Sequence, residues 1–259
     1  MLEKVLIKKS EGVGELILNR PEARNALNKE LIRDILEGLD ELRIDKEVQV
    51  ILVSGAGDKA FCAGADLKEL LAHKNVNDYR KHFEGVARII EKLAKIPQPT
   101  IASVHGFALA GGCGLAAACE FTVASEDAKF GLPEITMALL PLTVMAPILR
   151  AVGRKKGLEL VMTGEIINAQ EAERIGLVTR IYPKEQLAGK TRELARKLAS
   201  FSPFALQTVK EGFYTLADME YFKSLNYLRD VITITSMSQD AHEGITAFLE
   251  KRTPKWTGS

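Results

Sequence analysis

Alternation between strand-like and helix-like runs is the feature that most restricts the fold of this 259-residue chain. Val48 to Val53 is a largely β-branched apolar run, typical of a strand buried on both faces. It follows apolar residues at helical spacing over 31–42, behind the helix-capping residue Asn28. A second such pair, a helical pattern over 83–96 and the run Thr100 to Val104, comes next. The pattern predicts an α/β fold in which helices connect parallel strands.

Weaker signals extend this pattern along the chain. We expect an N-terminal hairpin (5–9 and 15–18), a short helix (115–118) and a strand (121–124). Further along we expect a helix behind Asn168, a strand (178–181) and helices over 184–199 and 203–222. After Pro141 the chain becomes mainly helical. We therefore divide it into a core with βα units, residues 1–195, and a helical C-terminal part, residues 196–259.

Composition argues against several classes of partner. The formal charge of +1 provides no overall attraction to nucleic acid or to an anionic membrane. The N-terminus lacks the pattern of a signal peptide and no run predicts a membrane span, so we expect a cytoplasmic protein. Three cysteines, an odd number, indicate reduced thiols. The four histidines lack metal-ligand spacing, so no metal is expected, and His105 is expected to make a structural hydrogen bond.

Two glycine-bearing stretches stand where a strand-like run gives way to a helix-like run. They are residues 61–66, Phe-Cys-Ala-Gly-Ala-Asp, and residues 110–114, Ala-Gly-Gly-Cys-Gly. Backbone N–H groups directed at one point beyond a helix start stabilise negative charge there. The two stretches together therefore predict a pocket of free amides, which an enzyme needs when it converts a thioester carbonyl into an enolate.

Five motifs in order make the chain similar to a known family. They are Asn19 to Leu27, Phe61 to Asp66, His105-Gly106 with Gly111-Gly112, Phe130 to Glu134, and Thr163-Gly164 with Gly176-Leu177-Val178. Together they resemble the enoyl-CoA hydratase/isomerase (crotonase) family over nearly the whole chain. The resemblance implies a spiral of repeated ββα units with a helical C-terminal trimerisation part. It also implies an acyl-CoA thioester substrate, a homotrimer or a hexamer built from two trimers, and no cofactor besides the coenzyme A of the substrate.

The resemblance also assigns roles to residues. The amides of Ala65 and Gly111 would hold the thioester oxygen, and Glu134 would be the acid/base. Arg24 and Lys68 would bind the CoA phosphates, and the segment with Phe248 and Lys251 would lie near the adenine, from the adjacent subunit in many members. The other positions assigned to the substrate site are Ala23, Ala63, Asp66, Gly112, Gly114 and Pro141. From its place before Leu67, Asp66 is expected mainly to cap a helix.

Two departures from the hydratase pattern leave the reaction open. Typical hydratases have a second glutamate where this chain has Gly114, and a glycine-rich run where it has the bulkier residues 142–147. Within that run, Thr143 is expected to be a helix N-cap. Glu120 and Asp127 are candidates to replace the missing acid, and neither can be assigned from sequence. Because enoyl-CoA hydration is the commonest family reaction, we expect an enoyl-CoA hydratase acting on 2-enoyl-CoA. The alternative is a Δ3,Δ2-enoyl-CoA isomerase with Glu134 as its single base, and a non-catalytic acyl-CoA-binding protein is the third hypothesis.

Overall fold

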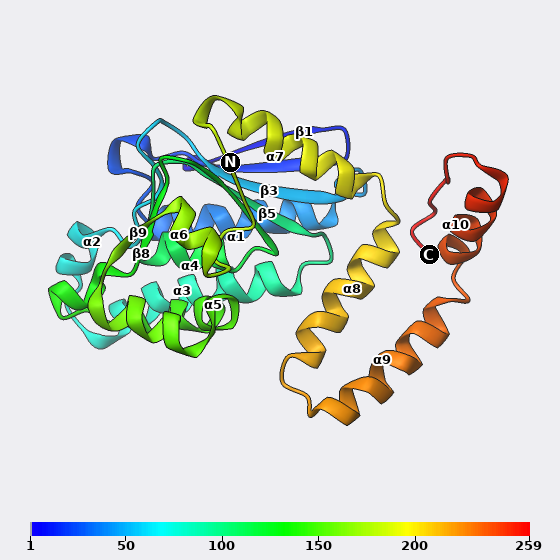
Figure 1. The fold of residues 1–259 in the computed structure, drawn as a ribbon. Coiled ribbons are helices and arrows are strands. Elements are labelled where there is room, and N and C mark those ends of the chain that lie inside the picture. Colours follow the sequence, from blue (N-terminus) through cyan, green and yellow to red (C-terminus); the bar gives the residue numbers. More distant parts are fainter. Residues whose placement is uncertain (1) are drawn as a thin grey trace.

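A computed structural model describes residues 2–259, in which two sheets and their helices form the core (Figure 1). The large sheet has the order β1-β2-β3-β5-β7-β10. Its strands are β1 (Val5–Ser10), β2 (Val13–Leu18), β3 (Val50–Gly55), β5 (Thr100–Val104), β7 (Phe121–Ser125) and β10 (Arg180–Tyr182). β1 and β2 form the predicted hairpin, and the remaining neighbours pair in parallel. The predicted α/β architecture is confirmed.

A second, four-stranded sheet was not foreseen from the sequence pattern. It has the order β4-β6-β8-β9 and consists of β4 (Ala60–Cys62), β6 (Phe107–Leu109), β8 (Lys129–Gly131) and β9 (Ile166–Asn168). Each of the successive pairs β3/β4, β5/β6 and β7/β8 places one strand in each sheet before the chain enters a helix. This repetition is the spiral of ββα units that the family resemblance implied.

Helices cover both faces of the large sheet because alternate strand residues point in opposite directions. Val50 and Leu52 of β3 pack with α7 (Lys184–Ala199), while Ile51 and Val53 face α1 (Lys29–Ile44) and α3 (Val76–Lys95). The strand is thus buried on both faces, as its composition predicted. Asn28 caps α1 by accepting a hydrogen bond from Leu31 N, also as predicted.

The remaining core helices are short or irregular. They are η1 (Pro21–Ala23), α2 (Leu67–Ala72), α4 (Gly111–Ala117), η2 (Pro133–Met137), α5 (Leu142–Thr163) and α6 (Ala169–Arg174). α4 begins at Gly111, before the predicted start at residue 115, and α3 begins at Val76 behind the cap Asn75. The N-cap position of α5 is Pro141, so the prediction that Thr143 caps this helix is wrong.

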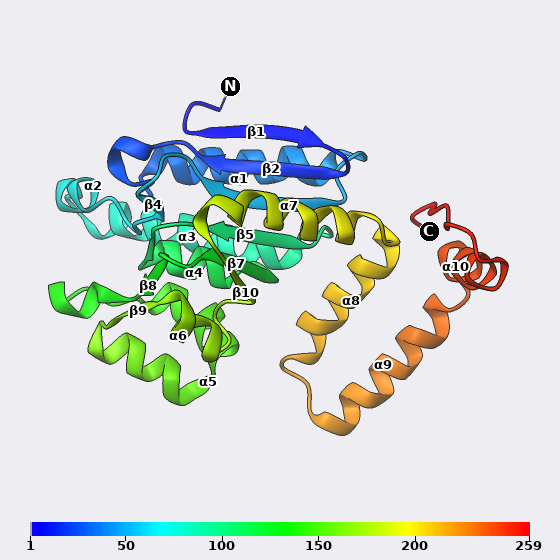
Figure 2. The ribbon, with the colours of Figure 1, turned by 45° about the horizontal axis from the view of Figure 1, so that its top comes forward.

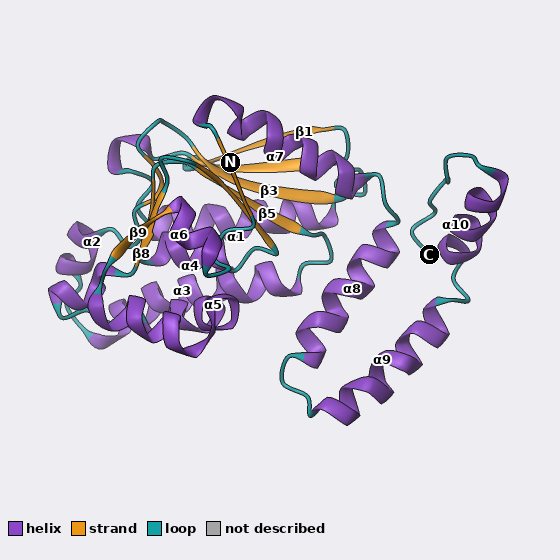
Figure 3. Ribbon diagram, in the orientation of Figure 1, coloured by secondary structure: helices purple, strands orange, loops and turns teal. Residues whose placement is uncertain are grey.

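An arm of three helices leaves the core after α7 (Figure 2). The helices are α8 (Pro203–Leu216), α9 (Tyr221–Thr235) and α10 (Gln239–Glu250). The single helical stretch expected over 203–222 is in fact divided, because Glu220 caps a new helix. The boundary proposed at residue 195 falls within α7, whose Leu198 still packs against the sheet. Figure 3 shows that the arm contains no strand among its described residues.

Candidate active site

The first glycine stretch is held beside the segment that precedes α1. Leu27 N donates to Gly64 O at 2.7 Å, and Asp66 N donates to Leu27 O at 3.0 Å. These two bonds flank residue 65, so the N–H of Ala65 points away from Leu27. Gly64 has a φ of +93°, a value that a side chain disfavours, and a Cβ there would lie 2.6 Å from that of Ala110.

The second stretch places a helix start next to the first. β6 ends at Leu109 and is followed by Ala110, whose φ of 51° turns the chain into α4 and whose N–H donates to Gly131 O at 2.9 Å. Gly111 is the first residue of α4, so its N–H has no partner within the helix. A Cβ placed on Gly64 would lie 3.2 Å from Gly111 N. The two stretches therefore meet at Gly64 and Gly111.

One cavity contains both amide-bearing residues and the predicted acid/base. It has a volume of about 220 Å³, and of the predicted site residues it is lined by Ala63, Ala65, Gly111, Glu134 and Pro141. Most of the remaining wall is apolar, with Leu27, Leu67, Leu70, Phe83, Val86, Met137, Leu139, Leu140 and Val144. An apolar wall with few convergent polar groups is the usual form of a small-molecule site.

Glu134 lies in η2 and lines this cavity. Leu139 N donates to Glu134 O at 3.1 Å, which curls the segment around the residue. Its Oε2 is buried, without a hydrogen-bond partner in residues 2–259. Burial raises the pKa of this carboxyl above its ordinary value, since a charged carboxylate is disfavoured away from water. Glu134 is accordingly a stronger base than an exposed glutamate.

The position of the missing acid is closed by packing. A Cβ added to Gly114 would lie 2.3 Å from Val144 Cγ1 and 2.4 Å from Val144 Cβ. Val144 is 3% exposed and belongs to the core, so it has little room to move. The two sequence departures, at residue 114 and after Pro141, are therefore one structural change: a valine of α5 occupies the place into which a side chain at 114 would project.

Neither candidate for a replacement acid lines this cavity. Glu120 Oε2 accepts hydrogen bonds from Thr100 N at 2.7 Å and Thr100 Oγ1 at 2.9 Å. Asp127 accepts from Ser125 Oγ at 2.5 Å and pairs with Lys184 at 3.2 Å. Both carboxylates have structural partners, so Glu134 is the carboxylate on the cavity wall within the described part of the chain.

Comparison with known proteins identifies the family of this chain. The family model described as enoyl-CoA hydratase/isomerase matches residues 8–259. The chain belongs to the enoyl-CoA hydratase/isomerase family. A probable enoyl-CoA hydratase of Rhizobium meliloti is 39% identical, with 96% of each chain covered, and the 2,3-dehydroadipyl-CoA hydratase of Escherichia coli is 36% identical, covering 99% of this chain and 100% of its own. The crystal structure of an enoyl-CoA hydratase from Bacillus anthracis superposes with a TM-score of 0.94, at 34% identity, over 99% of this chain and 100% of that one.

The other predicted site residues of this family member lie around the cavity or away from it. Asp66 caps α2 as expected, accepting from Lys68 N and Glu69 N, and it also pairs with Arg20 at 3.0 Å. Arg24 O accepts from Ala63 N at 3.0 Å, which ties η1 to the first glycine stretch. Ala23, Arg24, Asp66, Lys68, Gly112 and Gly114 do not line the cavity. Phe248 lies in α10, a helix of the arm (Figure 1), and Lys251 is the C-cap of that helix; neither residue lines the cavity.

Gly112 has a packing role that its assignment to the substrate site did not anticipate. A Cβ there would lie 2.1 Å from Cys62 O, so only a glycine lets α4 approach β4 this closely.

The three cysteines are free and buried, as predicted, and burial raises the pKa of each thiol to about 12. They are therefore small packing residues.

His82 is a cavity residue that sequence reasoning missed. It lies on the buried face of α3, four residues before Val86, and lines the same cavity as Glu134. The signal was present: His82, Val86, Ile89 and Leu93 follow the spacing of one helix face. From the sequence, His82 was considered only as a possible metal ligand, and no place in the cavity was predicted for it. In residues 2–259, no group of three or more His, Cys, Asp or Glu is arranged to hold a metal ion.

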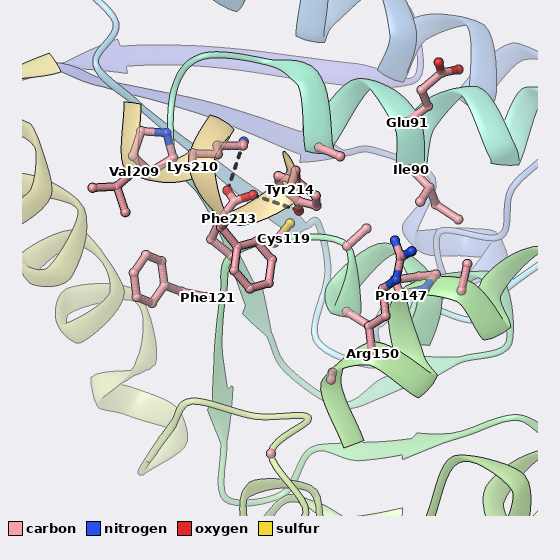
Figure 4. A pocket seen from close by; sticks show the side chains of 18 of the residues that line it. Ile90, Glu91, Cys119, Phe121, Pro147, Arg150, Val209, Lys210, Phe213 and Tyr214 are labelled. Carbon is pink, nitrogen blue, oxygen red and sulfur yellow. Dashed lines mark hydrogen bonds and ion pairs between the residues drawn. The ribbon is translucent and has the colours of Figure 1, made fainter. Parts of the chain in front are cut away.

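A second, larger cavity of about 740 Å³ lies where α8 meets the core (Figure 4). Lys210 of α8 donates to Leu93 O at 2.7 Å and Gln98 O at 3.0 Å, and pairs with Glu120 at 3.0 Å. Tyr214 donates to the other oxygen of Glu120 at 3.1 Å. These polar groups satisfy one another and anchor the arm. Ala65, Gly111 and Glu134 do not line this cavity.

Proposed function

We propose that this enzyme stabilises the enolate of an acyl-CoA thioester and moves protons on it with a single carboxylate. The N–H groups of Ala65 and Gly111 would hold the thioester oxygen, and Glu134 would exchange protons with the acyl chain. The observation that carries the proposal is that all three residues line one largely apolar cavity. Coenzyme A would enter as part of the substrate, with no other cofactor, and Arg24 and Lys68 would bind its phosphates.

The reaction that the site supports best is Δ3,Δ2-enoyl-CoA isomerisation. Glu134 would remove a proton from C2, the negative charge would spread over the thioester oxygen and C4, and the same carboxyl would return the proton to C4. The double bond then lies between C2 and C3, and no second acid is required. The packing of Val144 against Gly114 supports this choice, because it leaves no space for the second glutamate of typical hydratases.

Enoyl-CoA hydration is the second candidate, and the names of the relatives favour it. The Rhizobium and Escherichia coli proteins are both named as hydratases. Hydration of a 2-enoyl-CoA here would use Glu134 for both the water and the proton delivered to the α-carbon. Loss of catalysis with retained CoA-ester binding is the third possibility, and the half-buried, unpaired Glu134 argues against it.

Parallel assays of one preparation distinguish these reactions. 3-Hexenoyl-CoA should be converted to 2-hexenoyl-CoA faster than crotonyl-CoA is hydrated. Glu134→Gln should lower the turnover about 10²- to 10⁴-fold, the usual effect of losing a general acid/base. Glu84→Gln, an exposed change on α3, is the matched control. Hydration that exceeds isomerisation would establish the second candidate, and binding of both thioesters without turnover would establish the third.

We also propose that the arm packs against other copies of the chain, in a homotrimer or a hexamer of two trimers. Its helices expose large apolar side chains, including Tyr221, Phe222, Ile232, Ile234, Phe248 and Leu249. An exposed apolar surface of this kind on a soluble chain indicates an interaction site. In such an assembly Phe248 and Lys251 would approach a neighbouring active site. Sedimentation equilibrium gives the mass directly, and a monomer at micromolar concentration would contradict the proposal.

A further inference from the structure

The active-site cavity and the larger cavity beside α8 lie one after the other along the same helices. On α3, Phe83 and Val86 line the active-site cavity, whereas Ala87 and Ala94 line the larger one. Thr143 of α5 lines both cavities. At 1.5 Å per residue, the stretch from Phe83 to Ala94 spans about 16 Å along α3. The two cavities therefore adjoin at Thr143 and continue one another between α3 and α5.

The exposure of the wall residues shows where the active-site cavity is open. Leu27 and Val144 are 2% and 3% exposed, so the cavity is closed beside them. Leu67 and Leu140, by contrast, are 44% and 59% exposed and lie at its mouth. The CoA part of the substrate is too large for a cavity of about 220 Å³ and would occupy this mouth. An acyl chain that extends away from the mouth would pass Thr143 and enter the larger cavity.

The larger cavity is lined mainly by apolar side chains. Its volume of about 740 Å³ lies within the range of about 300–1,000 Å³ that is usual for ligand sites, whereas the active-site cavity is smaller than that range. Figure 4 shows Ile90 and Pro147 on one side of it and Phe213 on the other. Ala94 of α3 and Ala117 of α4 are too small to fill it. A hydrocarbon chain in this space would be stabilised because its apolar surface is removed from water.

The charged groups of the larger cavity favour an uncharged ligand. Each charged residue that lines it has an ionic partner; the pairs are Glu91–Lys95, Glu120–Lys210 and Arg150–Asp218. A charged ligand would have to compete with these pairs or remain without a partner, and an unpaired charge away from water is costly. An uncharged chain without hydrogen-bonding groups is therefore the ligand that fits.

We propose that the larger cavity binds the tail of a long acyl chain that reaches it past Thr143. This inference rests on the proposed binding of the thioester in the active-site cavity. It identifies the substrate class as acyl-CoA thioesters whose chains are longer than the active-site cavity alone can hold. Ala87 of α3 and Ala146 of α5 are small, exposed residues on facing walls of the larger cavity. They are specificity-determining residues, because a larger side chain at either position would take the place of the tail.

Binding of unreactive, saturated thioesters of increasing length tests this inference. Titration calorimetry would compare butanoyl-, hexanoyl-, octanoyl- and decanoyl-CoA, each below the concentration at which it forms micelles. Every added methylene should strengthen binding about 3- to 4-fold, the effect of burying one CH₂ group. Decanoyl-CoA should therefore bind about 10²-fold more tightly than hexanoyl-CoA. This affinity ratio is the readout, because partial unfolding of a variant affects both ligands equally.

Three variants locate the effect. Ala87→Phe and Ala146→Phe each place a ring in the larger cavity, and neither residue lines the active-site cavity. Each should lower the ratio of decanoyl-CoA to hexanoyl-CoA affinity below about 10-fold, because fewer methylenes are then buried. Ala188→Phe is the matched control: this exposed alanine of α7 lines neither cavity, so the ratio should persist.

The outcomes separate this inference from the proposed function. Affinity that stops rising at hexanoyl-CoA, or a steep rise that survives both Ala87→Phe and Ala146→Phe, would overturn the binding of the tail while leaving the acyl-CoA site intact. Sedimentation equilibrium of the same variants tests the competing occupant, a second copy of the chain. Dissociation of the oligomer by both variants, but not by Ala188→Phe, would assign the larger cavity to subunit contact and overturn the inference. Failure of every thioester to bind would contradict the proposed function itself.

Discussion

Adding one methyl group at residue 114 tests the packing that distinguishes this site. Helix propensity alone predicts that Gly114→Ala stabilises α4, because alanine is favoured over glycine by about 1 kcal/mol within a helix. The structure predicts the opposite. The new Cβ would lie 2.3 Å from Val144 Cγ1 and 2.4 Å from Val144 Cβ, an atom joined directly to the backbone of α5.

The size of the effect follows from these two opposing contributions. Overpacking a close-packed core costs about 1–3 kcal/mol, and contact with a Cβ places this case near the upper end. Subtracting the helix gain of about 1 kcal/mol leaves a net loss of about 2 kcal/mol in the free energy of unfolding. For a chain of this size the melting temperature should fall by about 4–8 °C.

A double-mutant cycle with Val144→Gly isolates the contact. Without the valine side chain, Gly114→Ala should regain its stabilising effect of about 1 kcal/mol, so the two changes should couple by about 3 kcal/mol. Urea unfolding of the four proteins, at equal protein concentration, measures this directly. A neutral or stabilising Gly114→Ala in the original background would refute the packing and reopen residue 114 to a larger side chain.

Three further results are expected. Burial raises the pKa of Glu134 above 4.5, the ordinary value for a glutamate, and the base acts when deprotonated. As the pH decreases, kcat/KM should therefore fall with an apparent pKa above 4.5; an apparent pKa at or below 4.5 would contradict the desolvation of this carboxyl. Lys210→Met should destabilise the fold by about 3 kcal/mol and expose α8 to proteolysis, since it leaves Glu120 without its cation, and adding Glu120→Gln should restore part of the loss. The buried thiols of Cys62, Cys113 and Cys119 should resist a thiol reagent at pH 8 in the native protein and react with it after unfolding. Fast labelling of the native protein would contradict their burial.

Elements with a strong periodic pattern were predicted closely. Thr100–Val104 and Lys184–Ala199 have the predicted bounds, and Asn28 is the cap that its position indicated. In these segments the local pattern and the burial agree. The strands β4, β6, β8 and β9 have three residues each, too few to show a period, and they exist because neighbouring strands provide hydrogen bonds.

The candidate site also has some features that the sequence predicted and others that it could not show. The ordered motifs identified the family and assigned Ala65, Gly111 and Glu134, which the structure brings to one cavity. Residue spacing could not show that Val144 fills the space beside Gly114, because the contact joins helices α4 and α5. It also could not show that Glu69 lies beside His82.

What the sequence by itself determined is the alternation of strands and helices and the caps Asn28, Asp66 and Asn168, because these depend on neighbours a few positions away along the chain. The residues of the amide pocket were assigned by the ordered motifs of the family. Only the tertiary structure decided that one carboxylate faces the cavity, that a buried imidazole lines it and that the arm leaves the core. The physical reason is that steric exclusion, desolvation and exposure depend on atoms that distant segments bring together.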